Sequence, residues 1–285
     1  MKQKILLNKI LIAVALVLTP FVINRINING IDKIIFINVG QGDATIVCTS
    51  YKICGLIDTG KRASIIDQIK KYTPYPLAFI LITHPDADHF AQTIPITQVI
   101  GTNRLFIGNT SKALDTLKAA QENGIAVYDI RDNNDFKIGN FFFDVIWPEA
   151  GSRINTLDSN DSSISIVLTS HNKKFVLAGD LGAKYENLLT QRYKLNSIDV
   201  LKLSHHGSKN SSSIDFLSTV MPKIAIISVG KNSYGHPSPL VLENLSKLNV
   251  PYLRTDQTGD IEFQLNNENT QIYSENTKNS YIILN

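Results

Sequence analysis

The segment from Thr83 to His89 (THPDADH) constrains the fold of this chain more than any other stretch. It directly follows an apolar run, 78–82, that is typical of a buried strand. Two imidazoles and two carboxylates then follow within six residues, and Pro85 disfavours helix just before it. Such groups at a strand end repel one another unless a cation lies among them, which indicates a divalent metal site. The alternative, a helix N-cap formed by Asp86 or Asp88, explains neither histidine.

Two further places follow the same pattern, in which an apolar strand ends and a metal-ligand residue stands at its tip. Asp180 follows a predicted strand at 174–178, and His205 follows one at 199–203. If these strand tips meet at one edge, the pocket between them is lined by His84, Asp86, Asp88, His89, Asp180 and His205. The set suffices for one or two divalent cations with Asp180 between them. Two cations can activate a water molecule and stabilise a leaving oxygen.

The other apolar runs predict two β-rich halves, each containing hairpins followed by helices. Further strands are expected at 34–39, 45–48, 53–57, 104–107, 125–128, 136–138, 141–146, 164–169 and 223–229. Helices are expected at 62–72, 111–123, 183–193, 214–220 and 240–248. Two sheets packed face to face with helices outside fit this order, so the expected fold class is α/β.

Residues 1–30 are expected to form a targeting segment, and residues 31–285 the functional domain. Three lysines in the first nine residues precede an apolar run at 10–23, which has signal-peptide length and is short for a membrane span. The small residues that resemble a cleavage site, 13–15, lie inside this run, so a cleaved signal peptide and an uncleaved anchor both remain open. A buried first helix of the domain is the third reading. The first two place the domain outside the cell, with membrane contact only through residues 5–23 if the segment is uncleaved.

Charge and cysteine content add two constraints. The chain has 28 Lys and Arg against 25 Asp and Glu, but four of the basic residues lie within the first 25, where no acid occurs. The remaining body is near neutral and argues neither for nor against nucleic acid. Cys48 and Cys54, the only cysteines, lie symmetrically about Tyr51 in a predicted hairpin. In an exported protein this favours a disulfide, with two independent thiols as the alternative.

Seven short motifs occur in one order along the chain: VGQGDA at 39–44, IDTG at 57–60, THPDADH at 83–89, LAGD at 177–180, SHHGS at 204–208, GHP at 235–237 and RTD at 254–256. As a set they resemble the metallo-β-lactamase-fold domain of the ComEC-type competence (DNA-uptake) proteins, over about residues 32–265. The resemblance implies an αββα four-layer sandwich, two mixed sheets flanked by helices, and a metal-dependent hydrolase. It also implies a first metal site made by His84, Asp86 and Asp180, and a second made by Asp88, His89, Asp180 and His205.

Departures from the common superfamily pattern bear on the metal. The usual H-x-H-x-D-H reads H-x-D-x-D-H here, with Asp86 in place of a histidine. Oxygen in place of nitrogen hardens the site, so Mn²⁺ is expected to support activity at least as well as Zn²⁺, with Mg²⁺ as a further candidate. Another histidine ligand of the superfamily has no counterpart, and Asp161 is the strongest ligand type in that loop. Asp58 is expected to orient a metal ligand without touching the metal.

Substrate contacts are expected beside this centre. Asp88, His206 and His236 are the expected catalytic residues, and one of the two histidines would protonate the leaving oxygen. Phosphate oxygens are expected to meet cations and hydroxyls from Lys202, Ser208, Lys209, Lys231 and Arg254. A groove lined by the basic residues among these would favour nucleic acid, and a small closed pocket would favour a metabolite.

Three hypotheses follow. The first is an exported phosphodiesterase or nuclease in which a metal-activated water attacks the phosphorus of DNA. With one apolar segment, the chain is expected to work beside a membrane DNA-uptake channel, or alone, rather than as the pore. The second is a metallo-hydrolase of a small ester, a lactone or a phosphorylated envelope component; nothing in the sequence speaks for a β-lactam. The third is a non-catalytic metal-binding module, which purified protein without bound metal would favour.

Overall fold

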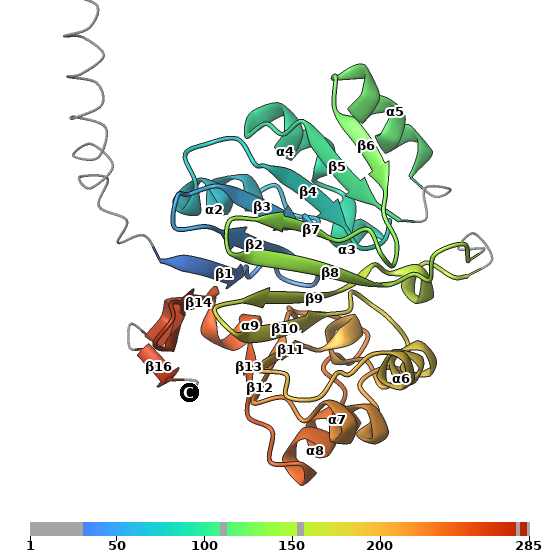
Figure 1. Ribbon diagram of the computed structural model, residues 1–285, viewed down its shortest axis with the longest axis vertical. Coiled ribbons are helices and arrows are strands. Elements are labelled where there is room, and N and C mark those ends of the chain that lie inside the picture. Colours follow the sequence, from blue (N-terminus) through green and yellow to red (C-terminus); the bar gives the residue numbers. More distant parts are fainter. Residues whose placement is uncertain (1–30, 109–112, 153–156, 278–279, 284–285) are drawn as a thin grey trace, which may run out of the picture. The chain divides into compact units, whose positions relative to one another are not determined.

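Two mixed β-sheets, packed face to face, contain most of the apolar sequence (Figure 1). The computed structural model describes residues 31–108, 113–152, 157–277 and 280–283. The predicted targeting segment and the first residues of the helix expected at 111–123 lie outside these ranges. Within the described residues, no helix is both long and apolar enough to cross a bilayer.

The first sheet has nine strands in the order β16-β15-β14-β1-β2-β3-β4-β5-β6. Their bounds are β1 Asp32–Phe36, β2 Thr45–Cys48, β3 Cys54–Ile57, β4 Phe79–Ile82, β5 Arg104–Ile107, β6 Ala126–Asp129, β14 Ile261–Leu265, β15 Thr270–Ser274 and β16 Ser280–Ile283. Strands β3 to β6 are parallel, and the other pairs are antiparallel. Cys48 and Cys54 lie directly opposite each other on β2 and β3 and form a disulfide.

The second sheet has seven strands in the order β13-β12-β11-β10-β9-β8-β7. Their bounds are β7 Phe136–Ile138, β8 Phe141–Trp147, β9 Ser165–Ser170, β10 Lys173–Leu177, β11 Val200–Lys202, β12 Ile224–Ile227 and β13 Tyr252–Arg254. The hairpin predicted from 136–138 and 141–146 is present as β7 and β8. Strands β10 to β13 are parallel, so this sheet is also mixed.

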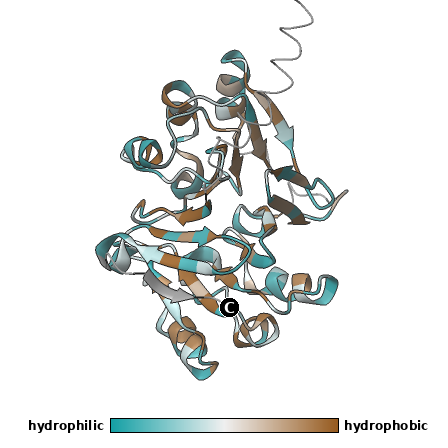
Figure 2. Cartoon of the chain, turned by 60° about the vertical axis from the view of Figure 1, so that its left-hand side comes forward, coloured by the Kyte–Doolittle hydropathy of each residue, from teal (hydrophilic) through white to brown (hydrophobic). Residues whose placement is uncertain are grey.

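Helices cover the outer faces of both sheets. On the first sheet they are α2 Ile65–Tyr72, α4 Thr93–Val99 and α5 Leu114–Glu122, with the single turn α3 Ala87–Phe90 at the strand ends. On the second sheet they are α6 Ala183–Arg192, α7 Ile214–Val220 and α8 Pro239–Lys247, and the short α9 Thr255–Thr258 follows β13. Each covering helix buries an apolar stripe on its sheet (Figure 2).

Strand β4 shows why the layers form. Phe79 and Leu81 face the core between the sheets, whereas Ile80 and Ile82 face the helices. Side chains alternate along a strand, so a continuous apolar run is favoured where both faces of the sheet are covered. The four-layer αββα sandwich expected from the sequence is confirmed.

The parallel strands fix where polar side chains collect. Asp58 follows β3, His84 follows β4, Asp180 follows β10, and His205 with His206 follows β11. The carboxyl ends of neighbouring parallel strands lie at one edge of their sheet, and the two sheets face each other there. The sandwich therefore brings these residues together from four separate parts of the sequence.

Candidate metal centre

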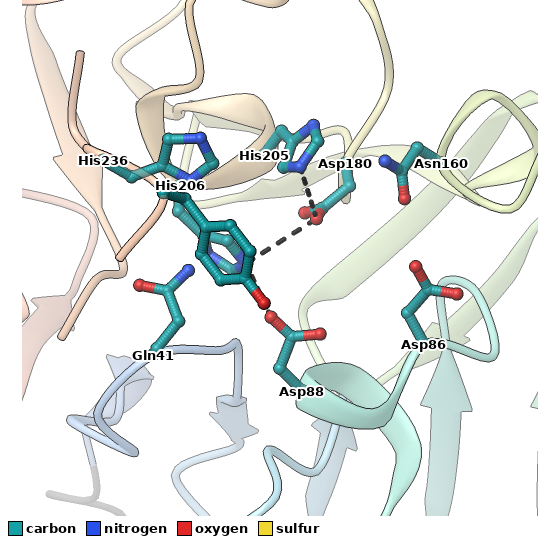
Figure 3. Close-up of a pocket in the computed structure, with 9 residues that line it drawn as sticks. Gln41, Asp86, Asp88, Asn160, Asp180, His205, His206 and His236 are labelled. Atoms are coloured by element: carbon teal, nitrogen blue, oxygen red, sulfur yellow. Dashed lines mark ion pairs between the residues drawn. The ribbon is translucent and has the colours of Figure 1, made fainter. Parts of the chain in front are cut away.

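Asp180 is the residue on which the imidazoles converge. Its Oδ1 lies 3.2 Å from Nε2 of His89, and its Oδ2 lies 3.6 Å from Nε2 of His206. Nε2 of His84 and Nε2 of His205 each lie 3.9 Å from the same Oδ2. The backbone N–H of Asp180 donates to Oγ of Ser163, which helps to hold the turn. Figure 3 shows His205, His206, Asp86 and Asp88 around this carboxylate.

Asp58 fixes the orientation of His89. Oδ2 of Asp58 lies 2.8 Å from Nδ1 of His89, so in the neutral ring the proton stays on Nδ1 and the lone pair on Nε2 faces Asp180. The main chain of His89 is also held, because Thr59 donates to its carbonyl through both its N–H and its hydroxyl. A carboxylate behind an imidazole is a common support for a metal-binding histidine.

Asp58 also reaches His84, through Thr83. The backbone N–H and the hydroxyl of Thr83 donate to the two carboxylate oxygens of Asp58, at 2.7 and 2.8 Å. Since that hydroxyl proton is committed, Nδ1 of His84, 3.1 Å away, is the donor to the Thr83 oxygen. The Nε2 lone pair of His84 is then left facing the centre, buried and without a hydrogen-bond partner in the part of the chain that the structure describes.

A backbone carbonyl fixes the third ring. Nδ1 of His206 lies 2.9 Å from the carbonyl oxygen of Ser228, so Nδ1 donates and Nε2 faces the centre. Nε2 of His206 lies 3.3 Å from Oδ2 of Asp88. The main chain at His205, His206 and Gly207 is left-handed, with φ of 51°, 54° and 77°. Non-glycine residues rarely adopt that conformation, and such strain persists where the surroundings enforce it.

Glu186 supports this strained turn from the protein interior. Its fully buried carboxylate accepts from Oγ of Ser204, at 2.7 Å, and from the backbone N–H of Ser212, at 2.6 Å. These contacts hold both ends of the segment that carries His205 and His206. Burial raises the pKa of Glu186 to about 7, despite these hydrogen bonds.

A buried ion pair lies behind the imidazoles. Asp43 pairs with Lys202, and both side chains are almost fully buried. Asp43 lies 3.8 Å from Nδ1 of His89 and 4.0 Å from Nδ1 of His206, on the side of each ring that faces away from Asp180. Ligand-type atoms of Asp43, His89, Asp180 and His206 all lie within 4.8 Å of one another. Because both Nδ1 atoms have closer acceptors, we assign Asp43 to the support behind the rings rather than to the metal.

Gly42 allows this support to pack closely. Its φ is +136°, and a Cβ there would collide with the carbonyl oxygen of Asp88. The same carbonyl accepts the backbone N–H of Asp43. The turn at 40–43 therefore needs glycine to bring Asp43 against the start of α3.

The pKa directions show how strongly the centre attracts positive charge. Burial lowers the pKa of His89 and His206, but for both rings the charge of Asp180 and the neighbouring carboxylates outweighs it and raises the pKa above the ordinary value. Burial and the charge of His89 hold the pKa of His84 well below its ordinary value. Burial alone would raise the pKa of Asp88, but the close contact and charge of His206, with the charge of His89, lower it to about 2.

A small cavity opens above these groups. Its volume is about 190 Å³, and it is lined by Gln41, Asp86, Asp88, Asn160, Asp180, His205, His206, Tyr234 and His236 (Figure 3). Asp86 is half-exposed, with 43% of its side chain accessible, and its Oδ2 lies 3.9 Å from Nε2 of His84. Asn160 has a buried side-chain oxygen without a hydrogen-bond partner. The cavity therefore offers oxygen atoms on its open side and nitrogen atoms at its base.

The donor set fits a divalent cation. Among the described residues, three Nε2 atoms and one carboxylate oxygen of Asp180 are buried without hydrogen-bond partners, and Asp86 and Asp88 add oxygens beside them. Uncompensated buried carboxylates are costly, and mixed imidazole and carboxylate ligands suit Zn²⁺ or Mn²⁺. His84, Asp86 and Asp180 lie on one side of the centre, and Asp88, His89, His206 and Asp180 on the other.

The structure places the two adjacent histidines differently from their predicted roles, His205 as a metal ligand and His206 as a catalytic residue. His206, expected as a proton donor, occupies the buried position that the sequence assigned to His205. His205 stands on the open side, with 26% of its side chain exposed, and touches the centre only through Asp180. The sequence offered two adjacent histidines on a strand end, and only the left-handed main chain decides which one turns inward.

The structure also shows where the other predicted residues around the centre lie. Asp161 does not line the cavity; its carboxylate accepts from the backbone of Gly182, and its neighbour Asn160 lines the cavity instead. Lys202 lies in the interior with Asp43, so it cannot contribute to an outer basic groove. Arg254 pairs with Asp256, and neither Arg254 nor Lys231 lines this cavity. Asp58 does contact a ligand histidine directly.

Sequence reasoning did not single out Asp43, Glu186 or Thr83. Asp43 was visible only as part of a glycine turn, and Glu186 as an ordinary helical residue. Each acts through contacts with residues distant in the sequence, which no local pattern reveals. A buried carboxylate inside an otherwise apolar helix stripe, as at Glu186, is the one signal that periodicity offers.

Comparisons with known proteins agree with this architecture. The family model described as Metallo-beta-lactamase superfamily matches residues 37–231. ComE operon protein 3 of Bacillus subtilis is 30% identical over 256 residues, covering 81% of this chain and 33% of that protein. Recombination protein 2 of Haemophilus influenzae is 28% identical over 257 residues, covering 85% of this chain and 30% of that protein. The chain thus spans about a third of the length of these curated relatives.

A solved structure shows the same fold at low identity. The metallo-beta-lactamase fold protein YhfI from Bacillus subtilis superposes with a TM-score of 0.58 at 10% identity, covering 81% of this chain and 99% of that one. The family match, the competence-protein relatives and the H-x-D-x-D-H centre all agree. The chain belongs to the metallo-β-lactamase superfamily, and its similarity to competence-protein relatives is consistent with the ComEC-type resemblance of its motifs.

Proposed function

We propose that this chain is an exported phosphodiesterase that hydrolyses DNA with the help of divalent metal. The superfamily is one of metal-dependent hydrolases, and the competence-protein relatives favour DNA as the substrate. The observation that carries the proposal is the set of three buried imidazoles, each with Nδ1 occupied, that direct Nε2 toward Asp180 beneath an open cavity.

The residues at the centre have distinct roles. Asp180 stands between the two sides of the centre, and His84, His89 and His206 provide the buried nitrogen ligands. When bound there, divalent cations supply Lewis acidity, which activates water and stabilises charge on phosphate oxygens. Asp86 and Asp88 complete the set from the cavity wall.

The charge of the cavity favours binding of metal before binding of substrate. Three carboxylates line it, and no Lys or Arg is among its lining residues. An anionic phosphodiester would be repelled by this lining on its own. Attraction must come from bound cations and protonated imidazoles, so substrate binding is expected to require metal.

His236 is the proton donor that we assign to the leaving oxygen. It lines the cavity, and His206 is committed to the buried ligand set. Burial, with the charges of His205 and His206, lowers the pKa of His236. A phosphodiester anion entering the cavity adds the opposite charge and raises that pKa toward neutrality, which suits general acid catalysis.

Export is supported by two observations. The basic and apolar segment at 1–30 has the order of a targeting sequence, and the Cys48–Cys54 disulfide suits an oxidising compartment. We further propose that the chain acts beside a membrane DNA-uptake channel, which the competence-protein relatives support.

A second candidate keeps the hydrolase and changes the substrate. The cavity above the centre, at about 190 Å³, is smaller than most ligand sites. That size suits a small ester, a lactone or a phosphorylated envelope component.

The deciding experiment incubates purified protein with single- and double-stranded DNA, a small aryl phosphodiester and a lactone, each with Mn²⁺, Mg²⁺ or Zn²⁺. An Asp180→Ala variant is the control. Metal-dependent DNA cleavage that is lost in the control would support the proposal. Hydrolysis of the small substrates with no DNA cleavage under any metal would replace it with the second candidate.

A further inference from the structure

A second cavity adjoins the metal centre. Its volume is about 460 Å³, and its lining includes the segment Ser208, Lys209 and Asn210 and the loop residues Tyr234 and Gly235. It shares His205, Tyr234 and His236 with the cavity above the metal ligands. A ligand whose phosphate lies at the metal centre can therefore extend into it.

The loop that carries Tyr234 is held by Asn232. The side-chain amide of Asn232 donates to the carbonyls of Gly230 and His236, both at 2.8 Å. Its oxygen accepts from the backbone N–H groups of Tyr234 and His236, at 3.0 and 3.1 Å. Four hydrogen bonds from one side chain fix this loop over the boundary between the two cavities.

Tyr234 projects from the fixed loop with 72% of its surface exposed, the highest value among the exposed large hydrophobic residues of the described chain. Its ring lies 5.7 Å from the ring of His236, at an interplanar angle of 31°. Nδ1 of His236 is buried and has no hydrogen-bond partner in the described structure. An ordered aromatic ring and an unused ring nitrogen at one boundary indicate a surface built to receive a ligand.

Lys209 brings positive charge to the same cavity. Lys209 is exposed and forms no ion pair with any carboxylate in the described part of the chain. Its backbone is ordered, because Ser208 donates to the carbonyl of His205 and the hydroxyl of Ser208 accepts from Asn210. A free ammonium group on a fixed turn suits a phosphate oxygen.

We infer that the second cavity binds an unpaired nucleotide next to the scissile phosphodiester, with its base stacked on Tyr234 and its phosphate paired with Lys209. The inference rests on the proposed phosphodiesterase function and narrows its substrate to single-stranded DNA. Stacking needs an exposed base face, and a base inside a duplex must first leave the stack to provide one. Aromatic stacking beside a backbone cation is sequence-tolerant, so no preference among bases is expected.

The test measures binding separately from cleavage. A fluorescent single strand with phosphorothioate linkages, which resist hydrolysis, is titrated with the full-length protein in Mn²⁺, beside a matched strand with abasic sites. Tyr234→Ala should weaken binding of the base-bearing strand about 5- to 150-fold, the range for one lost stack, and leave the abasic strand unchanged. Tyr234→Phe should bind both strands as the natural protein does.

Two further variants complete the test. Lys209→Ala should lower the slope of log affinity against log salt by about 1 for both strands. Tyr75→Ala is the matched control, because Tyr75 is 57% exposed and precedes β4, at the end of that strand remote from the centre. It should change nothing.

The remaining outcomes distinguish failure of the stacking subsite from failure of the phosphodiesterase function. Equal loss on base-bearing and abasic strands in Tyr234→Ala, or a Tyr234→Phe variant as weak as Tyr234→Ala, would overturn the stacking subsite even if DNA is cleaved. Binding that depends on Tyr234 without cleavage of ordinary DNA would keep the subsite and overturn the phosphodiesterase.

Discussion

The buried and the open halves of the metal centre are built differently. In the buried half, His84, His89 and His206 each have Nδ1 committed to a fixed acceptor, and none of the three side chains is appreciably exposed. In the open half, Asp86 and His205 touch the centre at 3.9 Å and face a cavity. The difference teaches that the buried half is organised before any ligand arrives, whereas the open half stays available to substrate.

Removing each of the two adjacent histidines in turn is expected to give the largest difference in metal content and activity. His206→Ala removes a buried ligand, so we expect loss of bound metal and an activity loss of about 10³-fold, corresponding to several kcal/mol of metal-assisted stabilisation. His205→Ala should retain metal and lose about tenfold or less. Metal content by mass spectrometry, measured beside kinetics for both variants, checks this. Equal metal loss in the two variants would remove the distinction between the halves.

The pH dependence of stability probes the support of the buried half. The pKa of Glu186 is about 7 in the folded chain, above its ordinary value of 4.5, so between these pH values the folded state retains a proton that the unfolded state has released. Stability should therefore fall by about 3 kcal/mol as pH rises from 4.5 to 7, and then level off.

Glu186→Gln should flatten this slope. At pH 5 its stability should stay close to that of the natural protein, because the amide oxygen can accept from the Ser212 N–H while the N–H₂ donates to Oγ of Ser204, as a protonated carboxyl would. Urea unfolding of metal-free protein at pH 5 and pH 7.5 measures both effects. A variant with an unchanged slope would assign the pH dependence to other groups.

Asp58→Asn tests whether one carboxylate organises two ligands. The amide has one acceptor oxygen where the carboxylate has two, and its N–H₂ must then face a donor of Thr83 or His89. The rings of His84 and His89 therefore lose their fixed orientation, and metal affinity should fall about 10- to 100-fold. Thr83→Val breaks only the route to His84 and should cost less. Competition with a chelator gives the affinities. If Thr83→Val lowers metal affinity as much as Asp58→Asn does, the contact of Asp58 with His89 contributes little to metal affinity.

The smallest expected effect concerns the choice of metal in the open half. Asp86→His restores H-x-H-x-D-H and replaces an oxygen with a nitrogen, which should shift the ratio of Zn²⁺- to Mn²⁺-supported activity toward Zn²⁺ by about tenfold. Activity titrations with each metal measure the ratio. An unchanged ratio would show that Asp86 does not bind the metal.

Much of this arrangement follows from local sequence pattern. The strand at Phe79–Ile82 with its polar successor, the hairpins and the four-layer order all depend on short-range periodicity, and the structure confirms them. The choice between His205 and His206 depends on a main-chain conformation imposed by Glu186 and Ser228, which lie far away in the sequence. Burial of Lys202 depends in the same way on Asp43. Such pairings form only when the two sheets meet, so one-dimensional patterns cannot report them.

The shared carboxylate of Asp58 has a consequence for how the centre fills. His84 belongs to one side of the centre and His89 to the other, yet the Thr83 hydroxyl behind His84 and Nδ1 of His89 share one oxygen, Oδ2 of Asp58. Because the hydrogen bonds that orient both rings are already made without metal, neither cation has to order its ring on binding. We therefore expect no cooperativity from ring ordering, and a metal titration no steeper than that of two independent positions.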